Sequence, residues 1–190
     1  MTQIMRAYGH PMTFALALLT MLSLFWALLF VGKSLRGGHQ YERLSTCLTV
    51  AAVVTSALFV SYVTLMSRPG ARDSQLSLIP LVDTIEAMLE PITFSHALGG
   101  VLANIALFVP VGMAVAMFRI RGRLLGWRPV LGTCLVFSLL VEVTQLLMNH
   151  GAVAAVDDLI TNTFGALLGW LLIRWLGQKI TVKTWEKRRS

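Results

Sequence analysis

Three carboxylates and three carboxamides stand within or beside long apolar runs in the second half of the chain. Glu142 and Gln145 are three residues apart, and Asp157, Asp158 and Asn162 follow after a short break. Carboxylates can transfer protons or bind cations, and carboxamides can orient a polar ligand. An acid inside a membrane is costly and is therefore a candidate functional group. Glu142 is the candidate acid or base.

The apolar runs that must position these groups predict membrane-spanning helices. The 190-residue chain is 56% hydrophobic and 13% charged, whereas a soluble domain carries about 25% charged residues. Residues 12–32, 44–67 and 97–118 contain no charged residue, and each reaches the roughly 20 residues that span a bilayer. Residues 129–148 and 158–176 are weaker candidates.

We therefore expect an all-α polytopic membrane protein, a compact bundle of five transmembrane helices in a single domain over residues 1–190. The first run is longer than the apolar core of a signal peptide, and cations follow it, so we read it as a span. Residues 177–190 are expected to form a basic cytoplasmic tail. Between Pro80 and Pro91 three acids share one helical face, which predicts a short external helix at the interface. These acids are Asp83, Glu86 and Glu90.

The distribution of cations predicts the topology. Of the 16 Lys and Arg residues, 13 fall in segment 33–43, segment 119–128 and the tail from Arg174 onward. Because cytoplasmic loops are enriched in Lys and Arg, we expect an inner-membrane protein with its N-terminus outside and its C-terminus in the cytoplasm. The net charge of +7 then reflects membrane lipids as partners and not nucleic acid.

This topology brings six polar residues to one depth in the outer third of the membrane. They are Asn104, Glu142, Gln145, Asp157, Asp158 and Asn162. With Arg68 at the external boundary, they predict a polar, ligand-binding cavity that opens outward. The alternative is a structural polar cluster that fixes helix packing.

Small and kinking residues are predicted to shape the helix contacts below this layer. Pro110 should kink its helix, and Gly112 shares a face with Asn104. Gly165 and Gly169 have the spacing that allows close helix approach, either within the bundle or in a homo-oligomer. Two cysteines, Cys47 and Cys134, are expected to be apolar packing residues, and no metal or cofactor is expected.

Several of these residues form motifs that resemble the VanZ-like family over residues 68–172. The motifs are Arg68 with Leu78-Ile79-Pro80, the block from Asn104 to Gly112, Glu142 with Gln145, and the block from Asp157 to Gly165 with Gly169. The resemblance implies a polytopic bacterial membrane protein, and the family takes its name from members that raise resistance to teicoplanin. Members usually carry an Arg between the Gln and the acidic pair, whereas this chain has no cation between Arg128 and Arg174.

Three functions are compatible with this sequence. The favoured one is a non-enzymatic envelope factor whose cavity binds a lipid-linked wall component, a glycopeptide or a partner protein. The second is an intramembrane enzyme acting on envelope lipids, with Glu142 as acid or base and with Asp157 and Asp158 holding a divalent metal, helped by His150. The third is a small proton-coupled transporter with Glu142 as the relay. The sequence leaves the question of enzymatic activity open.

Overall fold

The computed structural model describes residues 2–35, 39–66, 75–77, 85, 88–89, 94–120, 123–147 and 153–189. It contains five helices that are long and apolar enough to cross a membrane. The expected five-helix membrane bundle is thus confirmed. The helices are α1 (Thr2–Leu35), α2 (Glu42–Met66), α4 (Phe94–Ala116), α5 (Trp127–Leu147) and α6 (Val156–Arg189). Most of the predicted interfacial helix between Pro80 and Pro91 lies outside the described residues.

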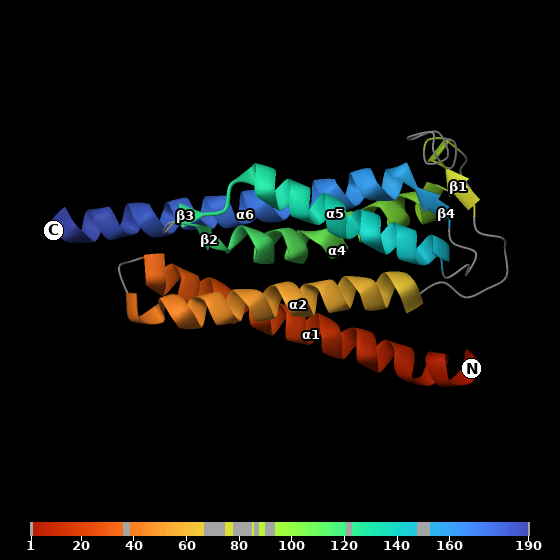
Figure 1. Cartoon of the computed structure of the whole chain (residues 1–190), viewed down its shortest axis with the longest axis horizontal. Helices are drawn as coiled ribbons and strands as arrows, with labels where there is room; N and C mark the ends of the chain where they lie inside the picture. The colour runs from red at the N-terminus through yellow and green to blue at the C-terminus, as the bar shows by residue number, and fades with distance from the viewer. Residues whose placement is uncertain are drawn as a thin grey trace.

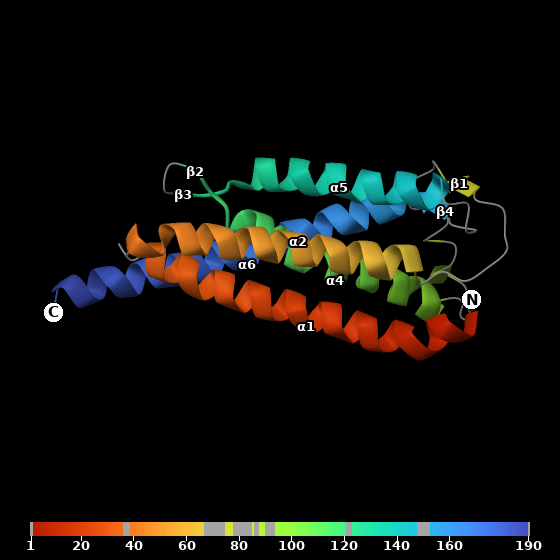
Figure 2. The same cartoon turned by 60° about the horizontal axis from the view of Figure 1, so that its bottom comes forward.

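Helix α4 is the centre of the bundle, because it contacts all four other long helices. Helices α1 and α2 form a hairpin through the short 3-10 helix η1 (His39–Tyr41), and α2 leans on α4. Helices α5 and α6 cover the other side, as Figures 1 and 2 show. The N-terminus lies at one end of the bundle and α6 projects beyond the other end (Figure 1).

Helices α4 and α6 run parallel and touch through their backbones at three glycines. A Cβ atom at Gly112 would lie 2.6 Å from the Cα of Ala166, and one at Gly165 would lie 3.0 Å from the Cα of Ile105. A Cβ at Gly169 would lie 2.7 Å from the backbone N of Met113. Real Cβ atoms almost never come this close to other atoms, so these positions must be glycine for the two helices to meet as they do.

The outer surfaces of the helices carry large apolar side chains, as a lipid-facing surface requires. Phe14 on α1 is 71% exposed, Leu140 on α5 is 59% exposed and Phe164 on α6 is 50% exposed. Inside the bundle, Phe108 is fully buried beside Phe137, with ring centroids 5.7 Å apart. The apolar residues therefore serve both the lipid contact and the core.

Hydroxyl groups connect α1 to α2. The Oγ atoms of Ser23 and Thr55 lie 2.8 Å apart, and the Thr20 hydroxyl donates to the Thr55 carbonyl at 3.2 Å. In lipid such bonds between helices contribute about 0.6 kcal/mol on average. They specify how the hairpin pairs without placing a charge in the membrane.

Two short strand pairs lie at opposite ends of the bundle, and neither was predicted from the sequence. Strands β1 (Gln75–Ser77) and β4 (Val153–Ala155) pair in parallel, with Leu76 opposite Ala154. Strands β2 (Arg119–Ile120) and β3 (Arg123–Leu124) form an antiparallel hairpin at the opposite end (Figure 1). With two or three residues each, these strands are too short to show the alternation that identifies a strand in sequence.

Candidate polar site at one end of the bundle

The central contact of the polar site joins α4 to α6. The side-chain amide of Asn104 donates a hydrogen bond to Oδ1 of Asp158 at 2.6 Å. Asn104 is in the middle of α4, whereas Asp158 is in the first turn of α6, where the helix dipole favours a carboxylate. The bond lies on the same interface as the glycine contacts, and it is closer than they are to the start of both α4 and α6.

A second bond joins α6 to α5. The Asn162 amide donates to the hydroxyl of Ser138 at 2.9 Å, and the two side chains are only 3% and 0% exposed. Asn162 stands one turn after Asp158, so both polar contacts of α6 come from adjacent turns. Helix α6 is therefore held by polar groups on both of its neighbours.

A third bond extends the site to α2. The Gln145 amide donates to the backbone carbonyl of Thr64 at 3.1 Å. Gln145 is 5% exposed, and its Oε1 atom is buried and accepts no hydrogen bond from any residue that the structure describes. We call the residues joined in this way, together with Glu142 and Asp157, the polar layer. Its members are Asn104, Ser138, Glu142, Gln145, Asp157, Asp158 and Asn162.

Two of the three acids in the polar layer are buried. Glu142 is 8% exposed and Asp157 is 7% exposed. Glu142 lies between Ser138 and Gln145 on one face of α5, at spacings of four and three. This burial removes both carboxylates from contact with lipid.

The polar layer lies toward the end of the bundle at which α5 ends and α6 begins. Glu142 lies about 8 Å from the end of α5 at Leu147, at 1.5 Å per residue. Asn162 lies about 9 Å from the start of α6 at Val156 by the same measure. The pair β1–β4 sits at this end of the bundle, and β4 leads directly into α6, so the strand pair stands beside the layer (Figure 1).

Some residues named from the sequence cannot be placed. Arg68 and His150 lie outside the described residues, so their distance from the polar layer stays a prediction. Pro110 is buried within α4, and Gly112, Gly165 and Gly169 form the α4–α6 contact. No group of three or more His, Cys, Asp or Glu residues that could hold a metal occurs within the described part of the chain.

Two participants in the layer were missing from the predicted site. Ser138 lies one turn from Glu142 on the same face, and that spacing was a usable signal. The Thr64 carbonyl left no signal, because any residue in the last turn of α2 has a backbone oxygen whose intrahelical donor is missing. Its use by Gln145 depends on how α2 and α5 are rotated toward each other.

In comparison with known proteins, a family model matches most of the chain. The family model described as VanZ/LLP1 covers residues 43–177, from the first turn of α2 to the end of the apolar part of α6. No curated protein and no solved structure matches the chain significantly. The match includes every member of the polar layer and the three contact glycines. The chain is therefore a multi-pass membrane protein that belongs to the VanZ/LLP1 family.

Proposed function

We propose that this protein is a non-enzymatic factor of the bacterial cell envelope. In this proposal the polar layer faces outward and binds the polar headgroup of a lipid-linked wall component. Such binding would alter the access of glycopeptide antibiotics to the wall. The observation that carries the proposal is that three acids and three amides from α4, α5 and α6 gather toward one end of a membrane bundle.

Packing alone does not account for this convergence. Helices α4 and α6 already meet through Gly112, Gly165 and Gly169, and such small-residue contacts are sufficient to associate helices in lipid. A carboxylate within a membrane span is costly and usually marks a functional site, and Glu142 is such a carboxylate, five residues from the end of α5. A buried acid in this position is better explained by a ligand than by helix association.

The charge distribution supports the outward orientation of the layer. Every Lys and Arg whose side chain the structure describes belongs to the end of the bundle opposite the polar layer. These residues are Lys33, Arg43, Arg119, Arg123, Arg128 and Arg174. Because that end should face the cytoplasm, the polar layer should lie near the external surface, with the N-terminus outside and the C-terminus inside.

The proposal is tested by binding in nanodiscs. Wild-type protein is titrated with lipid II, whose sugar hydroxyl and amide groups can donate hydrogen bonds to a carboxylate, and, separately, with teicoplanin, and binding is followed by native mass spectrometry. Glu142→Gln, which keeps the shape of the side chain, should weaken binding of at least one probe by about tenfold, equivalent to one charge-assisted hydrogen bond.

Glu42→Gln is the matched control. It is the same chemical change on an exposed residue at the opposite end of the bundle. It should leave binding unchanged. Equal binding by wild type and Glu142→Gln, or no binding of either probe by wild type, would contradict the proposed function.

A further inference from the structure

A group of cations lies at the end of the bundle that is opposite the polar layer. We call it the basic collar and define it by one lysine from α1, two arginines from the β2–β3 hairpin and one arginine from each of α5 and α6. They are Lys33, Arg119, Arg123, Arg128 and Arg174. Among residues with described side chains, the only acid at this end is Glu42. Among the residues with described side chains, the five collar cations therefore outnumber the acids at this end by five to one.

Three collar cations lie over aromatic rings. The Nζ atom of Lys33 is 4.9 Å from the ring centroid of Phe30, the Arg128 guanidinium is 5.4 Å from the Trp127 ring, and the Arg174 guanidinium is 5.8 Å from the Trp170 ring. Cation–π contacts of this kind hold a charged group in position while leaving its N–H donors available. Lys33, Arg128 and Arg174 are all exposed.

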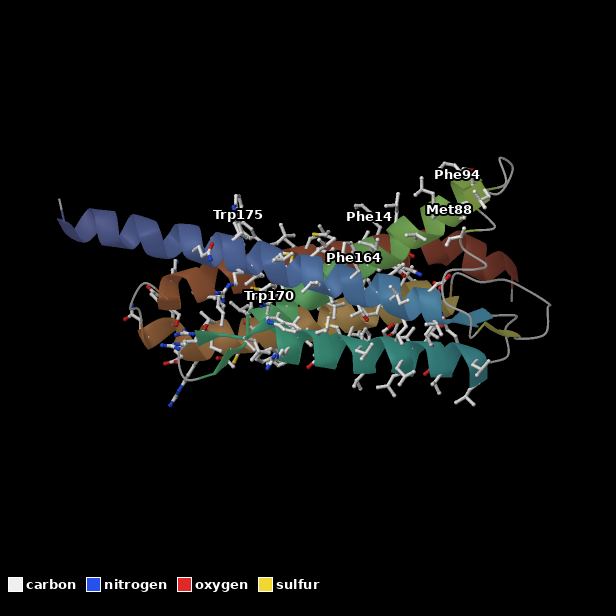
Figure 3. All side chains as sticks on the ribbon, turned by 90° about the horizontal axis from the view of Figure 1, so that it is seen from above. Phe14, Met88, Phe94, Phe164, Trp170 and Trp175 are labelled. Atoms are coloured by element: carbon white, nitrogen blue, oxygen red, sulfur yellow. The ribbon has the colours of Figure 1, made fainter. Side chains whose placement is uncertain are left out.

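Hydrogen bonds connect the β2–β3 hairpin and the residue that follows it to α6 and α1. The indole N–H of Trp170 donates to the carbonyl of Leu125 at 3.2 Å, and the backbone N–H of Leu125 donates to the carbonyl of Phe118 at 2.9 Å. Arg119 donates to the hydroxyl of Ser34 near the end of α1. Figure 3 shows Trp170 on the side of α6 that faces the hairpin, while Trp175 points away from the bundle. The collar is thus built from four separate elements in a fixed arrangement.

We infer that the basic collar is a binding site for the phosphate headgroups of anionic phospholipids. Guanidinium groups bind phosphate through two parallel N–H donors, and basic pockets between membrane helices on the cytoplasmic side bind anionic headgroups. Exposed tryptophans mark the level of the headgroups. Trp127 is 46% exposed and Trp175 is 53% exposed, which places the collar at the interface and not in bulk water. Its occupant is therefore a lipid of the surrounding leaflet.

The inference is tested on the full-length protein in neutral detergent. Phosphatidylglycerol and phosphatidylcholine are titrated separately, and retained lipids are counted by native mass spectrometry. Phosphatidylglycerol should bind with higher affinity, and increasing ionic strength should weaken it. Arg174→Gln should weaken phosphatidylglycerol binding by about fivefold, and Arg128→Gln combined with Arg174→Gln by on the order of 20-fold.

Two controls separate the collar from general charge effects and from misfolding. Arg43→Gln removes an exposed cation at the same end, outside the collar, and should change affinity by about twofold or less. Arg174→Lys keeps the charge and should retain most of the binding. Equal affinity for phosphatidylcholine, unchanged binding by the double variant, or full competition by inorganic phosphate would each overturn the inference. None of these results depends on the ligand of the polar layer.

Discussion

Replacing Gly169 with alanine is expected to destabilise the bundle by opening the α4–α6 contact. The added methyl would lie 2.7 Å from the backbone N of Met113 and 3.1 Å from the carbonyl carbon of Gly112. These neighbours are backbone atoms on a packed helix, so they cannot move aside as a flexible side chain can. Overpacking of this kind costs about 1–3 kcal/mol, because α6 must withdraw and lose dispersion contacts along the interface.

The helix propensity of alanine opposes this loss and must be measured separately. Alanine is favoured over glycine in a helix interior by about 1 kcal/mol. Gly132→Ala on α5 provides the control, because a Cβ there would meet nothing within 4 Å. It should be neutral or stabilising, whereas Gly169→Ala should lower the free energy of unfolding by about 0–2 kcal/mol after both effects are combined, which is about 1–3 kcal/mol below Gly132→Ala.

The assay is the free energy of unfolding of purified protein in bicelles, measured by steric trapping. Gly165→Ala should behave like Gly169→Ala, because its Cβ would overlap the backbone of Ile105. If Gly169→Ala and Gly132→Ala have the same free energy of unfolding, then α4 and α6 are not in backbone contact and the reasoning is wrong.

Three further predictions concern individual contacts. A double-mutant cycle of Asn104→Ala and Asp158→Ala should give a coupling energy of about 1 kcal/mol in unfolding measurements, since their side chains bond at 2.6 Å; additive effects would contradict that bond. The double variant Leu76→Cys and Ala154→Cys, in a background without native cysteines, should form a disulfide under mild oxidation, because the two positions are opposite each other and paired strands lie about 4.8 Å apart. The disulfide is detected by its effect on gel migration, and the absence of a cross-link would argue against the β1–β4 pair. Trp170→Phe should lower stability by about 1 kcal/mol through loss of its bond to the hairpin, while an unchanged melting temperature would refute a structural role for that bond.

The five helices were predictable from sequence because lipid imposes a simple requirement. A segment without charge over about 20 residues can satisfy its backbone only as a helix. The residues at which the helices end were less predictable. Helix α6 continues to Arg189, well beyond the predicted span ending at residue 176, because hydropathy detects the membrane-embedded part and not the helix that follows it.

Topology predicted that the members of the polar layer lie toward one end of the bundle, but it did not predict their pairings. Counting residues from the predicted helix ends places Asn104, Glu142 and Asn162 in the outer third of the membrane. That count cannot show that Asn162 would bond Ser138 or that Gln145 would reach a backbone carbonyl of α2. Such choices depend on the rotation and approach of each helix, which the glycine contacts set through tertiary packing.

The spacing of Gly165 and Gly169 correctly predicted a close helix contact, but it did not show which helix they contact. Gly165 and Gly169 were compatible with a contact inside the bundle or with a seam between two copies. The structure places both against α4 of the same chain. That choice required knowing that α4 and α6 run side by side, which no local pattern in either helix reveals.

Access of the polar layer from outside is the central claim, and cysteine labelling of intact cells tests it most directly. Asp158→Cys is made in a background in which Cys47 and Cys134 are replaced by alanine, because Asp158 is a half-buried member of the polar layer in the first turn of α6. Cells are treated with a membrane-impermeant maleimide. The matched control carries only the native Cys134, which is 0% exposed and two turns further into α5 than Glu142. We predict labelling at position 158 and none at Cys134. Labelling of position 158 only after the cytoplasmic face is exposed, or no labelling from either side, would contradict an outward-facing site.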